Sequence, residues 1–117
     1  MDKNGYNDSL IQRTHGSCYL CHRTGNTQRH EIFNGSLRQV SKALGLWCEL
    51  CDDCHYDVTN EMHWGGDETY NDHLKAIGER VYREHYSVSF EKFKKGALKH
   101  WEIEKLVKEY ENGKQHR

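Results

Sequence analysis

The stretch CELCDDCHYD, residues 48–57, places three cysteines at intervals of three and follows the last one with a histidine. A second pair lies upstream in CYLCH, residues 18–22, and 29 residues separate the two preferred CxxC units. Two such pairs are typical of a tetrahedral zinc site, because each short loop presents two thiolates to one ion. The predicted ligands of a structural Zn²⁺ are Cys18, Cys21, Cys51 and Cys54.

Cys48 offers a competing register, in which Cys48 and Cys51 form the second pair. That register places a ligand inside LWCEL, residues 46–50, which has the composition of a strand. It also leaves out Cys54, which stands at the turn into the next predicted helix. A small buried apolar residue is the commonest role of a lone thiol. We therefore expect Cys48 to lie in the core.

Three other kinds of cysteine chemistry fit the spacing less well. The run of three cysteines is similar to the C-x2-C-x2-C of bacterial ferredoxins, but the fourth cysteine and the proline are missing. Both CxxCH units match the attachment motif of c-type haem, which normally requires export. A redox protein built on CxxC is the third alternative. We expect neither haem nor an iron–sulfur cluster, and a colourless protein would exclude both.

The chain is short and polar. It has 117 residues, of which 35% are hydrophobic, and a mean hydropathy of −1.04. A single domain of this size buries little apolar surface, so a metal that cross-links the chain is physically expected. The sequence has no signal-peptide pattern and no apolar run of about 20 residues. We therefore expect a soluble cytoplasmic protein without membrane contact, whose cysteines stay reduced.

Charge is distributed unevenly, although the net charge is only −1. Residues 1–48 carry six Lys and Arg against three Asp and Glu, residues 49–79 carry one against nine, and residues 80–117 carry ten against six. An acidic centre between basic ends is compatible with a cation site inside a rim that faces DNA. A solvated surface of mixed charge is the plainer interpretation.

The chain is predicted to have three parts. They are a flexible lead-in over 1–16, a zinc-binding core over 17–66 and a helical extension over 67–117 that packs on the core. Within the core we expect a strand over 27–33, a short helix over 36–45, the strand LWCEL, and a helix that begins near Cys54 and ends before Gly65. The sequence makes no prediction of oligomeric state.

Two apolar stripes predict helices in the second half. Each places apolar side chains on one helical face, as expected for packing on the core. The first stripe, with Asp67 as its predicted cap, is Tyr70, Leu74, Ile77 and Val81. The second is Ile103, Leu106, Val107 and Tyr110.

The combination of motifs resembles a known family. Between the CxxC pairs lies RHEIFNG, residues 29–35, followed by Arg38 and Ser41, and GLWCELCDDCH, residues 45–55, ends on a histidine. This combined spacing resembles the HNH nuclease superfamily. It is most similar to small zinc-binding HNH proteins of phages and prophages of Gram-positive bacteria. The resemblance continues through HLKAIGERVYREHYSVSFEKF and covers roughly residues 18–93.

The resemblance implies an α+β fold with a ββα-metal (treble-clef) core, a structural zinc and a separate catalytic divalent ion. The ion would be Mg²⁺ or Mn²⁺, with Zn²⁺ or Ni²⁺ as alternatives. By position in the motif, His30 and His55 would be its ligands and Glu31 would occupy the place of the general base. The implied activity is cleavage or nicking of DNA phosphodiesters, in phage DNA processing or recombination in the bacterial cytoplasm. A Lewis acid on the phosphate and a base for water are what this hydrolysis requires.

At two positions the chain departs from the family pattern. Glu31 stands where the pattern has a histidine, and Leu46 stands near the place of the asparagine. Asn34 is a candidate substitute for that asparagine, and Glu31 could also bind the metal. The alternative function is therefore a zinc module that binds nucleic acid or a protein without cutting.

Three basic residues are candidate phosphate contacts, namely Arg29, Arg38 and Lys42. A solvated charge is an equal alternative for each. Likewise, His30 could be an ordinary strand residue and His55 could cap its helix. His22 is assigned no catalytic role, and His63 and His73, in the acidic centre, are expected to be surface residues rather than ligands.

Overall fold

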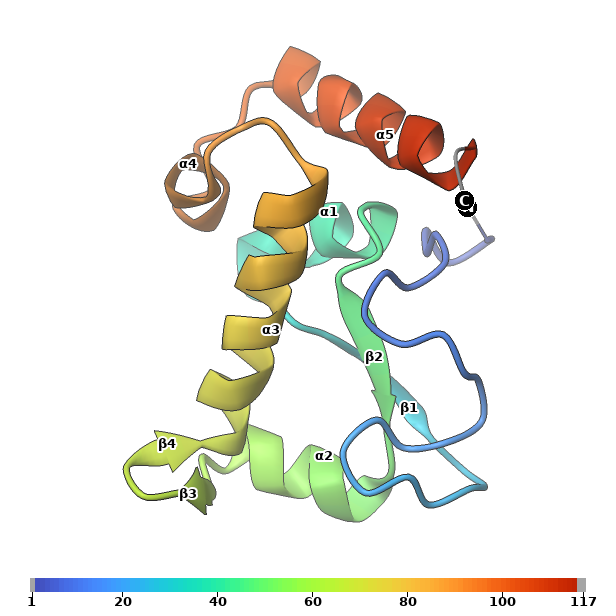
Figure 1. Ribbon diagram of the computed structural model, residues 1–117, viewed down its shortest axis with the longest axis vertical. Coiled ribbons are helices and arrows are strands. Elements are labelled where there is room, and N and C mark those ends of the chain that lie inside the picture. Colours follow the sequence, from blue (N-terminus) through green and yellow to red (C-terminus); the bar gives the residue numbers. More distant parts are fainter. Residues whose placement is uncertain (1, 116–117) are drawn as a thin grey trace.

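The computed structural model describes residues 2–115, which form an α+β fold with two small antiparallel sheets and five α-helices (Figure 1). The first half contains β1 (Gln28–Glu31), the 3₁₀ turn η1 (Gly35–Leu37), α1 (Arg38–Ala43), β2 (Trp47–Leu50) and α2 (Asp52–Thr59). The second half contains β3 (His63–Gly65), β4 (Glu68–Thr69), α3 (Tyr70–His85), α4 (Phe90–Lys94) and α5 (His100–Gln115).

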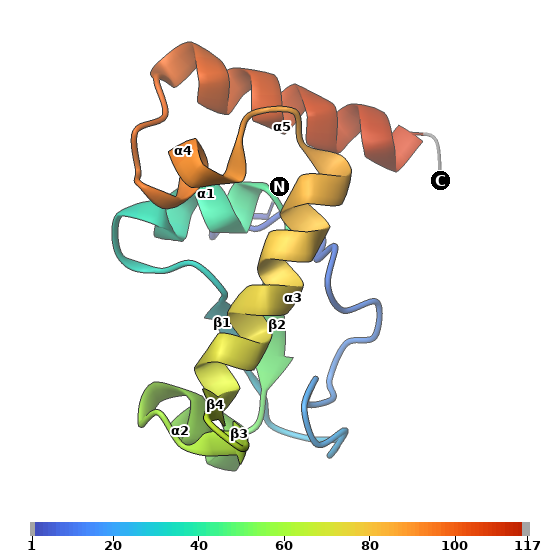
Figure 2. The same cartoon turned by 60° about the vertical axis from the view of Figure 1, so that its left-hand side comes forward.

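The hairpin of β1 and β2 organises the molecule. Its register pairs His30 with Cys48 and Glu31 with Trp47. Helix α3 lies along this hairpin, α2 crosses one end of it and α5 lies at the other end (Figures 1 and 2). The predicted strands and the predicted short helix are confirmed, and the helix stops before Gly45, whose φ of 71° permits the turn into β2.

A single core joins the two halves of the chain. Ring centroids lie 5.4 Å apart between Phe33 and Phe93 and 4.6 Å apart between Tyr82 and Phe93, so the connection after β1 shares one aromatic cluster with α3 and α4. Gly78 lets α3 approach closely, because an added Cβ would lie 2.7 Å from Ile32 Cγ2. Of the predicted stripes, the side chains that are buried are Leu74, Val81, Leu106 and Tyr110.

The N-terminal segment, for which the sequence predicts a flexible lead-in, makes defined contacts with the core. Residues 2–12, which we call the N-terminal strap, pack beside β2. The Asn7 N–H donates to Lys42 O at 3.0 Å and the Leu10 N–H donates to Gly45 O at 2.8 Å. The buried Gln12 side chain accepts from the Glu49 N–H at 2.8 Å. Backbone groups and polar side chains therefore hold this segment in place. Contacts of this kind leave no pattern of apolar residues in the sequence from which they could be predicted.

Three element boundaries also differ from prediction. Helix α2 ends at Thr59, and the following residues form the β3–β4 hairpin. Helix α3 begins after Thr69, which makes a capping box with Asp72, so the predicted cap Asp67 is wrong. The C-terminal helical run is divided by a break that contains Gly96 at φ 70°. Among the described residues, no helix combines the length and apolar character needed to cross a membrane.

Candidate metal centre and adjoining polar pocket

The first CxxC pair lies in a tight turn. The Cys18 N–H donates to Arg23 O at 2.9 Å and the His22 N–H donates back to Cys18 O at 2.8 Å. A bridge between Ser17 and Thr24 closes the turn, and His22 adopts φ 66° to complete it. The turn brings the thiols of both cysteines to the same side of the loop, as a bidentate metal-binding unit requires.

The second CxxC pair lies where β2 passes into α2. Cys51 is the N-cap of α2, with extended backbone angles, and its sulfur accepts from the Cys54 N–H at 3.5 Å. Cys54 lies in the first helical turn, so both thiols face the same side of the helix end. Two contacts reach this helix from the preceding chain: Arg23 of the first turn pairs with Asp53 at 3.1 Å, and Gln28 of β1 donates to Asp52 at 2.7 Å.

The two pairs meet to form a site that could hold a metal ion. The four sulfur atoms all lie within 4.8 Å of one another, and Cys21 Sγ lies 3.7 Å from Cys51 Sγ. Tetrahedral zinc with Zn–S bonds near 2.3 Å requires sulfur separations of about 3.8 Å. The donors therefore fit a structural zinc. The residues that form this site are the four predicted ones, Cys18, Cys21, Cys51 and Cys54.

The environments of the thiols support the predicted register. Burial opposes ionisation of Cys18, but backbone N–H groups of Cys21 and Cys51 outweigh it and lower its pKa to about 6. Cys48 is fully buried outside the cluster, and desolvation raises the pKa of its thiol to about 12. Its burial and its position outside the cluster make Cys48 a core residue, as predicted. Within the cluster the pKa of Cys18 is lowered, whereas burial and the neighbouring thiols raise the pKa of Cys54.

His30 and His55 converge beside this centre. Their ring centroids lie 5.7 Å apart at an interplanar angle of 78°. His30 is only 7% exposed, and its Nε2 has no hydrogen-bond partner within residues 2–115. Burial, with a smaller contribution from His55, lowers the pKa of His30 to about 4. The ring is therefore neutral at pH 7, the form in which one of its two nitrogens can accept a bond.

The two histidines line a polar pocket of about 550 Å³, which we call the histidine pocket. Its other lining residues are Gln28, Arg29, Glu31, Asn34, Gly35, Arg38 and Thr59. All three members of the predicted catalytic set, His30, Glu31 and His55, thus reach one cavity. Leu46 does not, because it is fully buried in the core, whereas the exposed Asn34 lies on the pocket wall.

Glu31 is engaged by an arginine. Its side chain is 8% exposed, and an oxygen lies 2.7 Å from Arg38 Nε, whereas the Arg38 side chain is 59% exposed. Burial raises the pKa of Glu31, but the hydrogen bond and charge of Arg38 outweigh this effect and the net pKa is lowered. Glu31 is therefore ionised, and its carboxylate already accepts a hydrogen bond from Arg38. This hydrogen bond weakens Glu31 as a general base.

Arg29 and Lys42, two of the predicted phosphate contacts, also contact the strap, and Arg29 lines the histidine pocket as well. Arg29 pairs with Asp2 at 2.7 Å and lies 4.4 Å from the Tyr6 ring centroid. Lys42 Nζ lies 4.8 Å from the centroid of the same ring. These two cations flank Tyr6 and hold the strap. Sequence reasoning missed Tyr6, because nothing in its local pattern marks the contact.

The four cysteines form the one group of three or more clustered metal-ligating side chains that is found in the described part of the chain. His63 and His73 lie outside it, in contacts of the β3–β4 hairpin, where His73 stacks on Trp64. Comparisons of the chain with protein-family models, with curated proteins and with solved structures found no match.

Proposed function

We propose that the protein is a metal-dependent endonuclease of the HNH type that cleaves or nicks DNA. The observation that carries this proposal is the convergence of His30 and His55, with the buried and unpartnered His30 Nε2, in a polar pocket beside the cysteine centre. A buried polar atom without a partner carries an energetic cost, and a role in binding a ligand would explain why the fold retains it. Action in phage DNA processing, in a bacterial cytoplasm, is part of the same proposal.

The order of elements supports a ββα-metal, treble-clef core. A cysteine turn, the β1–β2 hairpin and helix α2 follow one another, with Cys51 and Cys54 at the start of the helix. A structural zinc on the four cysteines would fix this helix end relative to the hairpin. His55 comes directly after Cys54, so the same zinc would hold His55 opposite His30. The zinc site is in this way a support for the histidine pocket.

The histidine pocket offers two side chains that could bind a second divalent ion. His30 and His55 would hold it, and two protein ligands leave positions for water and for the substrate; imidazole donors suit Zn²⁺ or Ni²⁺ better than Mg²⁺. Such an ion would polarise the scissile phosphate and lower the pKa of a bound water. Burial keeps His30 neutral, as a ligand must be. Arg38, still 59% exposed beyond its contact with Glu31, would reach a phosphate oxygen at the pocket rim.

The alternative function is a zinc module that binds nucleic acid or a protein without cutting. Two observations favour it. Leu46, near the place of the family asparagine, is buried and offers no polar group. Glu31, in the place of the general base, is held by Arg38 at 2.7 Å with a lowered pKa. For cleavage to proceed through Glu31, Arg38 would have to release the carboxylate when it contacts substrate.

A plasmid assay separates the two functions. Zinc-loaded protein is incubated with supercoiled DNA and Mg²⁺ or Mn²⁺, and the nicked and linear products are measured on a gel. We expect nicking by the natural chain and its loss in His30→Ala and His55→Ala. The matched control is His22→Asn, because His22 also follows the second cysteine of a CxxC pair, is exposed and has a φ of 66° that asparagine tolerates.

The outcomes are distinct. Equal nicking by His55→Ala and by the natural chain would contradict the histidine pocket as the active site. No nicking by the natural chain, with retained zinc and retained DNA binding, would favour the non-cutting module. Zinc content is measured for every variant, since loss of zinc from His55→Ala would make its inactivity a structural effect. His30→Ala, which lies on β1 away from the cysteines in sequence, provides the second test of the pocket.

A further inference from the structure

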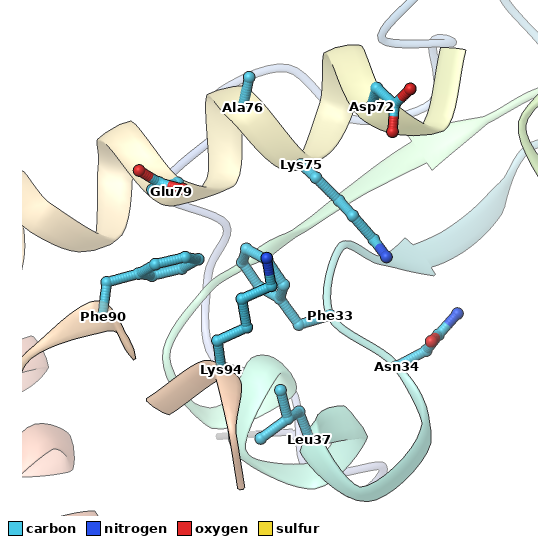
Figure 3. Close-up of a pocket in the computed structure, with 9 residues that line it drawn as sticks. All are labelled: Phe33, Asn34, Leu37, Asp72, Lys75, Ala76, Glu79, Phe90 and Lys94. Atoms are coloured by element: carbon cyan, nitrogen blue, oxygen red, sulfur yellow. The ribbon is translucent and has the colours of Figure 1, made fainter. Parts of the chain in front are cut away.

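A second cavity lies between α3, α4 and the connection from β1 to α1. It has a volume of about 430 Å³, and we call it the lysine pocket. Figure 3 shows Lys75 reaching into it from α3 and Lys94 reaching into it from α4. Phe33, Leu37 and Phe90 form its apolar part. The pocket therefore has two flexible cations above an apolar floor.

Two lysines and two carboxylates line this pocket, and the two carboxylates are engaged by groups outside it. Asp72 also lines it, but its carboxylate caps α3 through the Thr69 N–H. Glu79 lines it too, and its carboxylate is paired with Arg83 at 3.1 Å. Within residues 2–115, by contrast, no ion pair closer than 4 Å involves Lys75 or Lys94. The carboxylates have partners and the two ammonium groups are free to take an anion.

The lysine pocket adjoins the histidine pocket. Asn34 lines both cavities, and Lys75 extends from α3 toward Asn34 (Figure 3). Asn34 is exposed and precedes η1, and its side chain makes no capping hydrogen bond to that turn. A chain with regularly spaced phosphates that occupied the histidine pocket would pass Asn34 and reach Lys75 next. Lys94 lies across the second cavity from that point.

We propose that the lysine pocket binds backbone phosphates of the nucleic-acid strand that occupies the histidine pocket, with Lys75 and Lys94 as the anion contacts and Asn34 as the link between the two cavities. This rests on the proposed function as far as it takes the ligand to be nucleic acid. Ammonium groups bind phosphates as mobile point charges, and the apolar floor suits the sugar or a base edge. Because phosphate contacts carry no sequence information, the pocket would set affinity and position rather than sequence preference.

The salt dependence of binding measures such contacts directly. Each neutralised phosphate contributes about 0.9 to the slope of log K against log salt for duplex DNA and about 0.7 for single strands. We therefore expect the double variant Lys75→Ala, Lys94→Ala to lose about 1.8 of this slope on duplex or about 1.4 on a single strand. If only the single-stranded or only the duplex DNA shows the loss, that form of DNA is the one that occupies the lysine pocket.

The experiment is fluorescence anisotropy of labelled single-stranded and duplex oligonucleotides with the full zinc-loaded chain, at several salt concentrations and without added Mg²⁺ or Mn²⁺. The matched control is Lys105→Ala, Lys108→Ala, which removes two exposed lysines from α5. The conservative variant Lys75→Arg, Lys94→Arg keeps both charges and should keep the slope. Zinc content and thermal melting verify the fold of each variant.

A slope reduced in the pocket variant, retained in the arginine variant and unchanged in the α5 variant would establish the site. Equal slopes for the pocket and α5 variants, or no binding of either oligonucleotide by the natural chain, would overturn it. Because binding is measured without a metal that supports cleavage, this result is independent of nicking. A lysine-dependent slope together with no nicking would retain the lysine pocket and reject the nuclease.

Discussion

Replacing Gly45 with alanine should loosen the N-terminal strap from the hairpin. Gly45 has a φ of 71°, which disfavours a side chain, and it lies between α1 and β2. An added Cβ would lie 2.5 Å from Asp8 O and 3.1 Å from Leu10 N. Both of these are backbone atoms of the strap, which no change of side-chain rotamer can move away. The strap itself therefore has to shift.

The cost can be estimated from two separate effects. Alanine in the left-handed region costs about 1–2 kcal/mol, and overpacking against a fixed neighbour costs about 1–3 kcal/mol. Gly45→Ala should then destabilise the protein by about 2–5 kcal/mol if the two effects add. Gly66→Ala is the reference, because Gly66 has a φ of 60° with nothing within 4 Å of the added Cβ. It should lose only the conformational part, about 1–2 kcal/mol.

Equilibrium urea unfolding of both variants, with zinc present throughout, measures this difference. The fluorescence of Trp47 is a suitable signal, because its indole N–H donates to Asn7 O of the strap at 2.8 Å. A deficit of about 1–3 kcal/mol for Gly45→Ala relative to Gly66→Ala is expected. Equal destabilisation of the two variants would refute the reasoning, and it would restore the flexible lead-in that the sequence suggests.

Three further tests examine other parts of the fold. Cys51→Ser should reduce zinc from one ion per chain to almost none, whereas Cys48→Ala should leave it unchanged; metal analysis that showed zinc loss in both would contradict the register. Tyr86→Phe removes the 2.7 Å hydrogen bond that its hydroxyl donates to Leu44 O, and urea unfolding should show a loss of about 1–2 kcal/mol. Thr69→Ala removes the cap of α3 and should cost about 1 kcal/mol, while Thr69→Ser should restore most of it.

The cysteine centre could be predicted because the geometry of each ligand pair depends on residues that are neighbours in the sequence. Each CxxC unit contains its own geometry, so spacing alone identifies Cys18 and Cys21, and the turn into α2 selects Cys51 with Cys54. The same local logic assigned Cys48 to the core, where it is fully buried. Apolar periodicity likewise located α3 and α5, since helical stripes follow a fixed period.

The strap and the β3–β4 hairpin were not predictable by these means. The strap is held by backbone hydrogen bonds to Lys42 and Gly45 and by the polar side chain of Gln12. Such contacts leave no periodic pattern in the sequence, and the partners are more than 30 residues away. In the hairpin, β4 is only two residues long, too short for alternation to be read, so the Gly65–Gly66 pair looked like the end of a helix.

The contacts of the strap, which the sequence does not reveal, change the interpretation of two predicted phosphate contacts. From sequence, Arg29 and Lys42 are free cations near the motif, but in the fold both are directed to Tyr6. For either to bind a phosphate, the strap would first have to release Tyr6 and, for Arg29, the pair with Asp2. That release carries an energetic cost which a phosphate contact would have to exceed.

Lys75 and Lys94 carry no such cost, because no carboxylate in the described residues pairs with them. Both belong to the helices that follow the cysteine centre, and both open into a cavity that Asn34 shares with the histidine pocket. An anionic strand would therefore gain more by turning toward α3 and α4 than toward the strap. On this argument the helical extension is part of the binding surface as well as part of the core. Removing charge at Arg29 should then change the salt dependence of DNA binding less than removing charge at Lys75.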